Sequence, residues 1–516
     1  MNKRNLPQVA TAFTAIILLG LISAGAFVAF DDPNSSFVRE SSASGPNMAS
    51  IGDACSDHTG ENDVGPATRP SVTIDISRHE DSVVTGDGVE EEHVYARFNI
   101  TYQNTDALTK FTVLTTDRGS VVSTQGFSNV FENTYQAQQN AETASITYEY
   151  DITEMERGSG LLSYYATPDR EIFTPVPQFR HGWIITDDGQ TTPTCSYLFS
   201  DDVRRTITSS DETTVSKTSA FIGAGPHGMH KTTTGNTTIT VVSPSTTNMN
   251  VDQRHQLGQL VATDRALDVN ATVTDVTVFS INGGRDGGAA FGRSRASPRY
   301  QTVWVQQRSR VDALGSTWAH EYVHTHQDIN PDTDMRWFTE ASATYYANII
   351  PYQCGDYEPG EFNTSLQTEM DLIAPPGSNS SVQEPYNQSV LAEPETWGTD
   401  ANYHRGAVVL YMLDVKLRDA TGGEHTLMDE FRWLNDQDES VSYVEFRRHV
   451  VSQSNEDVGT WLDKAVTTDA ELNMTGVTPP ETGPMNESTC SVQYTGHEYD
   501  DGEEEETPDP PDGNTQ

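Results

Sequence analysis

The 516-residue chain carries 75 acidic and 31 basic side chains, which give it a net charge of −44 at pH 7. This charge excludes a nucleic-acid-binding protein, because the surface has no cationic area that could displace counterions from phosphates. The length and the 35% hydrophobic content predict a globular protein with more than one domain.

Residues 9–30 form an uncharged, apolar stretch that is long enough to span a bilayer. Two basic residues precede it and two aspartates follow it, so the positive-inside rule places the bulk of the chain outside the cell. Two interpretations stay open, an uncleaved membrane anchor and a signal peptide cleaved near Ala24-Gly25-Ala26. Both predict an extracellular or cell-surface protein.

Other features of the sequence agree with export. Nine Asn-x-Ser/Thr sequons are compatible with a glycosylated surface. The excess of carboxylates, with Arg favoured over Lys, is similar to the composition of haloarchaeal proteins, whose acidic surface stays hydrated in concentrated salt. One or two disulfides are expected, with the pairing left open, among Cys55, Cys195, Cys354 and Cys490.

After the apolar stretch, the chain divides into four predicted segments. Residues 31–69 are rich in Ser, Gly, Asn and Asp, which predicts a disordered stalk. Residues 70–218 alternate apolar and polar side chains in short runs, which predicts a β-sandwich. Residues 219–470 begin with strands and continue with helices, which predicts a two-lobed α+β domain. Residues 471–516 are acidic and Pro-rich, which predicts a disordered tail.

The elements of the α+β domain follow from its hydrophobic period. Strands are expected at 236–244, 273–281 and 300–306, with a glycine-rich loop before the last of them. One helix is expected after residue 250. The others are expected at 311–327, 335–350, 403–417, 427–434, 443–452 and 458–466. Ser442 and Glu445 form a capping box at the start of the helix at 443–452.

The stretch STWAHEYVHTHQ, at 316–327, contains three of the chain's 14 histidines. His320 and His324 are four residues apart, so on a helix both imidazoles lie on one face and reach the same metal ion. Glu321 flanks that face, where it can accept a proton from metal-bound water. His326 points about 200° away round the helix and is expected beside the site or at the surface.

A catalytic zinc site needs a third protein ligand and an open position for water. Glu340, in the helix predicted to return alongside the first, is the expected third ligand. Asp328 and Asp334, which lie in the connecting turn, are the alternatives.

The motif HEYVH, followed by RWFTEASATYY, resembles the gluzincin metallopeptidases, which include aminopeptidase N and the glycyl aminopeptidases. The resemblance implies a β-sandwich followed by a two-lobed, thermolysin-like zincin domain with a helical C-terminal half, a bound Zn²⁺ and a peptide or protein substrate. It implies that His320, His324 and Glu340 are zinc ligands and that Glu321 is the general base. The segment NYHRGAVV resembles the Tyr-Glu-Lys-Gly-Ala segment of the group, and this implies that Tyr403 stabilises the oxyanion.

The resemblance also implies a substrate site. Strand 300–306 is expected to be the edge strand that pairs with substrate, with Gly288, Ala289 and Trp304 as contacts. Exopeptidases of the group hold the substrate's free amine with a glutamate, but the corresponding loop, GGRDGGAAFGRSR, has Asp286 as its only acid. Its three arginines would repel an ammonium group, so cleavage within a chain and cleavage at its amino terminus both stay open.

The sequence therefore favours an exported zinc metallopeptidase. The alternative is a cell-surface structural or adhesion protein that has a peptidase-like fold and little or no activity. A zinc hydrolase acting on a non-peptide substrate is a third hypothesis. The oligomeric state is left open.

Overall fold

The computed structural model describes most of residues 71–477. The longest gaps lie at 104–109, 152–164, 186–193, 245–252, 282–287, 292–299 and 366–388. The predicted membrane span or signal peptide, the stalk and the tail beyond 477 lie outside the described residues. Within the described part, no helix has both the length and the hydrophobicity that a bilayer crossing requires. Cys354 is disulfide-bonded.

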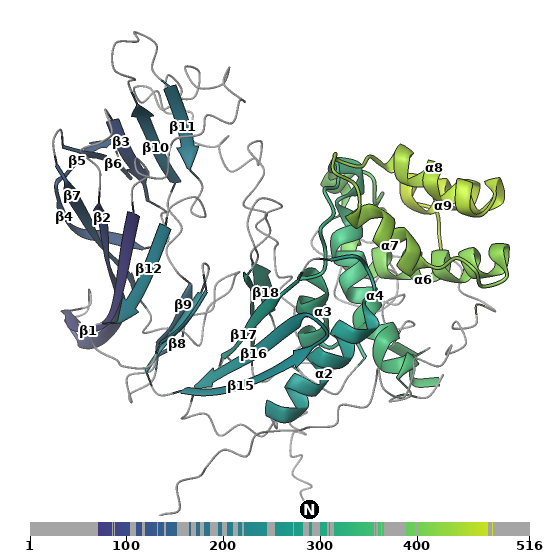
Figure 1. Ribbon diagram of the computed structural model, residues 1–516, viewed down its shortest axis with the longest axis horizontal. Coiled ribbons are helices and arrows are strands. Elements are labelled where there is room, and N and C mark those ends of the chain that lie inside the picture. Colours follow the sequence, from purple (N-terminus) through teal and green to yellow (C-terminus); the bar gives the residue numbers. More distant parts are fainter. Residues whose placement is uncertain are drawn as a thin grey trace, which may run out of the picture.

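The first half of the described chain consists of β-sheets (Figure 1). One five-stranded sheet has the order β12-β1-β2-β7-β4, with β1 at Ser71–Val84, β2 at Glu90–Gln103, β4 at Ser120–Gln125, β7 at Thr143–Asp151 and β12 at Arg204–Ser209. A second has the order β11-β10-β3-β6-β5, with β3 at Lys110–Leu114, β5 at Phe127–Phe131, β6 at Thr134–Ala137, β10 at Arg180–Ile185 and β11 at Thr194–Leu198.

These two sheets share one hydrophobic core. Phe98, Ile100 and Tyr102 of β2 are buried, and the residues between them are more exposed, as the period of two predicts. Phe111 and Val113 of β3, in the second sheet, belong to the same core. The two sheets therefore pack face to face over a common layer of side chains.

A third sheet of four strands was not expected from the sequence. Its order is β13-β14-β9-β8, with β8 at Tyr165–Ala166, β9 at Ile172–Pro175, β13 at Val215–Lys217 and β14 at Phe221–Ala224. Its strands are too short for the alternation of side chains to be recognised in the sequence.

The fourth sheet supports the candidate site. Its order is β15-β16-β17-β19-β18, with β15 at His227–Thr234, β16 at Thr237–Pro244, β17 at Asp275–Ile281, β18 at Gly288–Phe291 and β19 at Tyr300–Gln306. Helices α2 (Gln253–Ala266) and α3 (Thr317–His324) cover one face, where Leu260 and Trp318 pack against Val303 and Val305. The opposite face packs against the third sheet.

The second half of the described chain is mainly helical, as expected. Helix α4 spans Trp337–Gln353, α6 spans Ala401–Thr421, α7 spans Leu427–Asn435, α8 spans Tyr443–Gln453 and α9 spans Glu456–Thr467. The capping box of Ser442 and Glu445 at the start of α8 is confirmed. Helix α3 is shorter than expected, because Gly315 adopts a φ of +70° and turns the chain just before it.

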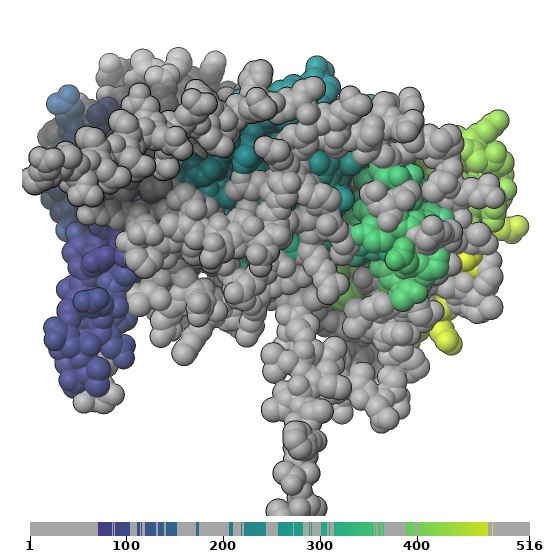
Figure 2. All heavy atoms as spheres, turned by 90° about the horizontal axis from the view of Figure 1, so that it is seen from below, coloured from purple at the N-terminus to yellow at the C-terminus, as the bar shows by residue number. Residues whose placement is uncertain are grey.

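Close packing in the helical half brings α6 to the site. A Cβ atom at Gly406 would lie 2.6 Å from Cβ of Ala341, so only glycine allows α6 to approach α4 this closely. The buried guanidinium of Arg405 donates hydrogen bonds to the carbonyls of Ala465, Thr468 and Ala470, which fastens the end of α9 to α6. Figure 2 shows the C-terminal helices at one end of the molecule and the β1 region at the other. The domain boundaries at 70, 218 and 470 stay predictions.

Candidate metal centre

Three side chains from α3 and α4 converge on one point. The Nε2 atom of His320 lies 3.1 Å from Nε2 of His324 and 3.2 Å from Oε2 of Glu340. The Nε2 atom of His324 lies 3.3 Å from the same carboxylate oxygen. These atoms form a nearly equilateral triangle. Its sides match the separation of about 3.3 Å between two ligands of a tetrahedral zinc ion.

Hydrogen bonds at the far side of each ring orient the two imidazoles. The Nδ1 atom of His324 lies 2.9 Å from Oε1 of Gln327, whose amide nitrogen donates to the carbonyl of Thr339. Nδ1 of His324 must therefore donate, which leaves the Nε2 lone pair for a metal. The Nδ1 atom of His320 lies 3.4 Å from Oγ1 of Thr344. Two lone pairs and a carboxylate oxygen thus face one another, an arrangement that a cation stabilises.

The donor set fits Zn²⁺. Burial alone would raise the pKa of Glu340, but the two imidazoles, when protonated, outweigh it through the charge of His324 and hydrogen bonds from both rings and lower the pKa to about 2. Two imidazole nitrogens and one anionic oxygen form the ligand set of a catalytic zinc site with a fourth position left for water. Ca²⁺ and Mg²⁺ prefer sites made of oxygen atoms alone.

Asp328 and Asp334, the alternative ligands in the turn between α3 and α4, are not part of this cluster. The Oδ1 atom of Asp334 accepts a hydrogen bond from the backbone N–H of Tyr443, at the start of α8. The backbone N–H of Asp328 donates to the side chain of Asn435, at the end of α7. The turn therefore connects the metal-centre helices to α7 and α8.

His326 is buried, so the surface alternative for this residue is wrong. Its Nε2 atom lies 3.2 Å from Oδ1 of Asp264 on α2, and the same oxygen accepts a hydrogen bond from the hydroxyl of Tyr322. His326 thus helps to hold the end of α3 against α2, on a different side of α3 from the cluster.

Glu321 is enclosed between α3 and the edge of the fourth sheet. Its carboxylate accepts a hydrogen bond from the backbone N–H of Ala290 in β18. A Cβ atom at Gly288 would lie 2.7 Å from Cγ of Glu321, so β18 and this side chain are in close contact. Burial raises the pKa of Glu321, while the charges of His320 and His324 oppose the rise. A buried carboxylate with a raised pKa is suited to accept and return a proton.

The edge of this sheet differs from the expectation. Strand β19, at 300–306, was expected to be the edge strand, but it lies between β17 and β18. The edge strand is β18, which pairs antiparallel with β19 and came from within the glycine-rich loop. Four residues with two small alanines at the centre carry too weak a strand pattern to be recognised beforehand.

The three predicted substrate contacts do not all lie at this edge. Gly288 and Ala289 belong to β18 itself. The side chain of Trp304 was expected to contact substrate, and this is contradicted by its position. Successive side chains of a strand point to opposite faces, so Trp304 is buried with Phe279 and Phe173 on the face opposite α3. Asp286 and the three arginines of the loop lie outside the described residues.

Tyr403 lies beside the metal centre. Its ring stacks on that of His320, with the ring centroids 5.6 Å apart and the planes 11° from parallel. The residue is half-buried on the first turn of α6. The approach of α6 to α4 at Gly406 positions this turn.

The sequence interpretation missed the two residues that orient the imidazoles, Gln327 and Thr344. Each lies one helical turn beyond a predicted ligand, Gln327 three residues after His324 and Thr344 four residues after Glu340. That spacing, combined with a polar side chain in an otherwise apolar helix, is a signal that could have identified them.

Comparison with known proteins gives a likeness of structure. The sequence matches no protein-family model and no curated protein. The fold is similar to the crystal structure of an aminopeptidase N family protein from Idiomarina loihiensis, with a TM-score of 0.53 and 11% identity over 78% of this chain and 77% of that chain. An M1 zinc metallopeptidase from Deinococcus radiodurans matches with a TM-score of 0.41 and 13% identity over 82% of this chain and 98% of that chain. The first likeness supports the gluzincin-type fold that the sequence resemblance implied, and this chain therefore shares the fold of an aminopeptidase N family protein.

Proposed function

We propose that this chain is a zinc-dependent metallopeptidase that hydrolyses peptide bonds. The convergence of His320, His324 and Glu340, with the buried Glu321 next to them, carries the proposal. The fold shared with an aminopeptidase N family protein supports a peptide as the substrate.

In this proposal His320, His324 and Glu340 hold the zinc ion. When bound, zinc lowers the pKa of a coordinated water to about 7 and polarises the scissile carbonyl. Glu321 takes a proton from the attacking water and passes it to the leaving amine. The hydroxyl of Tyr403 donates a hydrogen bond to the oxyanion that develops on the carbonyl.

Strand β18 provides a surface for the substrate backbone. It is the last strand of its sheet among the described residues, and an extended peptide could pair with its outer edge. The hydrogen bond from Ala290 to Glu321 joins this strand to the general base. A peptide bound along β18 would therefore pass next to the carboxylate that moves the proton.

Export of the chain is part of the proposal. The apolar residues 9–30 would carry the remainder across the membrane, as an anchor or as a cleaved signal peptide. The net charge of −44 calls for assays in molar salt, where repulsion between the carboxylates is screened.

The test is digestion of an unbiased peptide library in molar salt by the wild-type chain and by Glu321→Gln. We expect the wild type to cleave, and the variant to lose cleavage while keeping its zinc, because Glu321 is not a ligand. The cut positions distinguish endopeptidase from aminopeptidase activity. Cleavage by Glu321→Gln would refute the role of the base. A wild type that binds zinc but cleaves no peptide would support the structural or adhesion alternative.

A further inference from the structure

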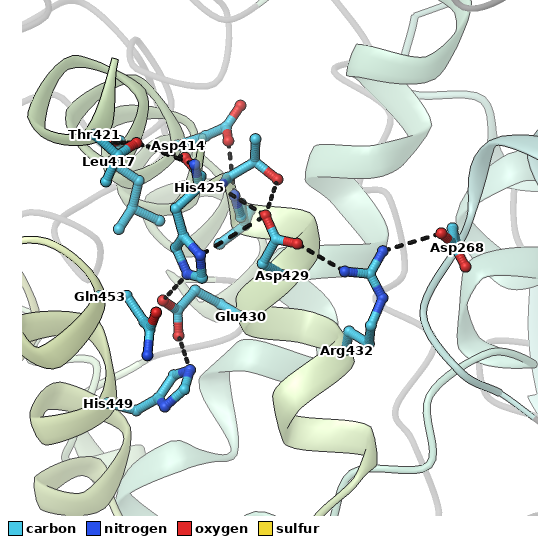
Figure 3. A network of polar contacts seen from close by, with 12 residues as sticks. Asp268, Asp414, Leu417, Thr421, His425, Asp429, Glu430, Arg432, His449 and Gln453 are labelled. Atoms are coloured by element: carbon cyan, nitrogen blue, oxygen red, sulfur yellow. Dashed lines mark hydrogen bonds and ion pairs between the residues drawn. The ribbon is translucent and has the colours of Figure 1, made fainter. Parts of the chain in front are cut away.

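A second cluster of metal-binding side chains lies in the helical half of the protein. It consists of His425, between α6 and α7, Glu430 on α7 and His449 on α8 (Figure 3). One ligand atom from each residue lies within 4.8 Å of the others. None of the three takes part in the site described above.

The distances within this cluster leave one contact unexplained by hydrogen bonding. The Nε2 atom of His425 lies 2.9 Å from Oε1 of Glu430. The Nε2 atom of His449 faces Oε2 of the same carboxylate at 3.7 Å. That distance is too long for a hydrogen bond, but it is close to the separation of about 3.3 Å between two ligands of one zinc ion.

Among the described residues, the Oε2 atom of Glu430 has an ion-pair contact with His449 but no hydrogen-bond partner. The side chain is fully buried. A buried carboxylate oxygen without a hydrogen-bond partner destabilises the fold. A cation between Oε2 and the two imidazoles would compensate for that loss.

Neighbouring side chains hold both rings in place. The Nε2 atom of His425 is directed at Glu430 by their 2.9 Å contact, and its Nδ1 atom faces a carboxylate oxygen of Asp429 at an ion-pair distance of 3.9 Å. The ring of His449 stacks on Trp433, with the centroids 4.1 Å apart and the planes 5° from parallel. A carboxylate behind a histidine ligand and a packed ring are typical of preorganised metal sites.

We propose that His425, Glu430 and His449 form a second divalent-metal site of the zinc type, separate from the catalytic centre. Two imidazole nitrogens and one carboxylate oxygen favour Zn²⁺ over Ca²⁺ and Mg²⁺. The ligands come from three successive segments, so the ion would clamp α8 to α7 and to the loop after α6. The fourth position is filled by water or by the amide oxygen of Gln453, which lies one turn after His449 on α8 and is drawn with the cluster in Figure 3.

The test is the zinc content of the full chain after equilibration with Zn²⁺ and removal of free ions. We expect about two zinc ions in the wild type and one in His449→Phe, which keeps a flat ring on Trp433 but removes the ligand nitrogen. Glu430→Gln should also hold one, and it keeps the volume of the buried side chain if the phenylalanine disturbs packing. The matched control His79→Phe, in the β1 strand, should hold two.

A second set of variants separates this site from the proposed peptidase centre. The double variant His320→Ala/His324→Ala should keep one zinc ion, and added Zn²⁺ should raise its melting temperature. Adding His449→Phe to the double variant should remove both the remaining zinc ion and the rise in melting temperature. A His449→Phe chain that holds as much zinc as the wild type, or a His320→Ala/His324→Ala chain that holds none, would overturn the proposal. If the protein cleaved no peptide, the proposed function would fail, but the zinc counts expected for this second site would stay the same.

Discussion

The backbone N–H of Ala290, in the edge strand of the fourth sheet, donates a hydrogen bond to the buried carboxylate of Glu321 on α3. This bond links the strand proposed to bind substrate to the residue proposed to move the proton. A shift of β18 would therefore shift the general base.

The close contact of Gly288 with Glu321 predicts that Gly288→Ala lowers activity. The added methyl group would lie 2.7 Å from Cγ of Glu321 and must displace either the carboxylate or the strand. We expect kcat/KM to fall about 10²-fold, as a misplacement of about 1 Å can produce, with the zinc content unchanged. The control is Gly360→Ala, because a Cβ atom there meets nothing within 4 Å. Equal activity of the two variants would contradict the contact.

The raised pKa of Glu321 predicts the acid side of the pH profile. Glu321 must be ionised to accept a proton, so kcat/KM falls as the pH drops through the pKa of this residue. Burial raises that pKa, so the fall should occur above the ordinary value of 4.5. Zinc content measured at the same pH values separates this effect from loss of the metal. A profile that stays flat down to pH 4.5 with zinc retained would argue against Glu321 as the base.

Removal of the Tyr403 hydroxyl should slow the chemical step. Tyr403→Phe keeps the ring stacked on His320 and removes the group proposed to stabilise the oxyanion. We expect kcat to fall about 10²–10³-fold with little change in KM or zinc content. Tyr443→Phe is the control, because its hydroxyl bonds Asp463 between α8 and α9. A change in KM alone would indicate a role in substrate binding.

The hydrogen bond from His324 to Gln327 predicts a change in zinc affinity. Gln327→Met has a similar volume but offers no strong acceptor for the Nδ1 proton of His324. We expect zinc to bind about 10–100-fold more weakly, measured by competition with a chelator. Gln437→Met is the control, because the amide of Gln437 donates to a backbone carbonyl at the end of α7. Unchanged affinity would show that the tautomer of His324 does not depend on Gln327.

Local patterns in the sequence were enough to predict the α-helices of the described chain and some of its strands. The period of two in β1, β2 and β7 and the apolar stripes of α6 to α9 reflect how side chains repeat along a strand or helix, a property of neighbouring residues. For the same reason, the spacing of His320 and His324 was enough to place both imidazoles on one face.

The sequence could not predict which strand would lie at the edge of the fourth sheet. That position depends on the antiparallel pairing of β18 with β19, in which a glycine and two alanines supply few local cues. The face on which Trp304 lies was decided in the same way, by the packing of the third sheet against the fourth.

The sequence by itself determined that the imidazoles of His320 and His324 would lie one helical turn apart with Glu321 beside them, because the helical repeat sets their separation. Only the tertiary structure brought Glu340 to them and enclosed Glu321 beneath β18. It also gathered His425, Glu430 and His449 from three segments. Those contacts join residues distant along the chain, and the free energy that holds them comes from the packing of whole helices and sheets.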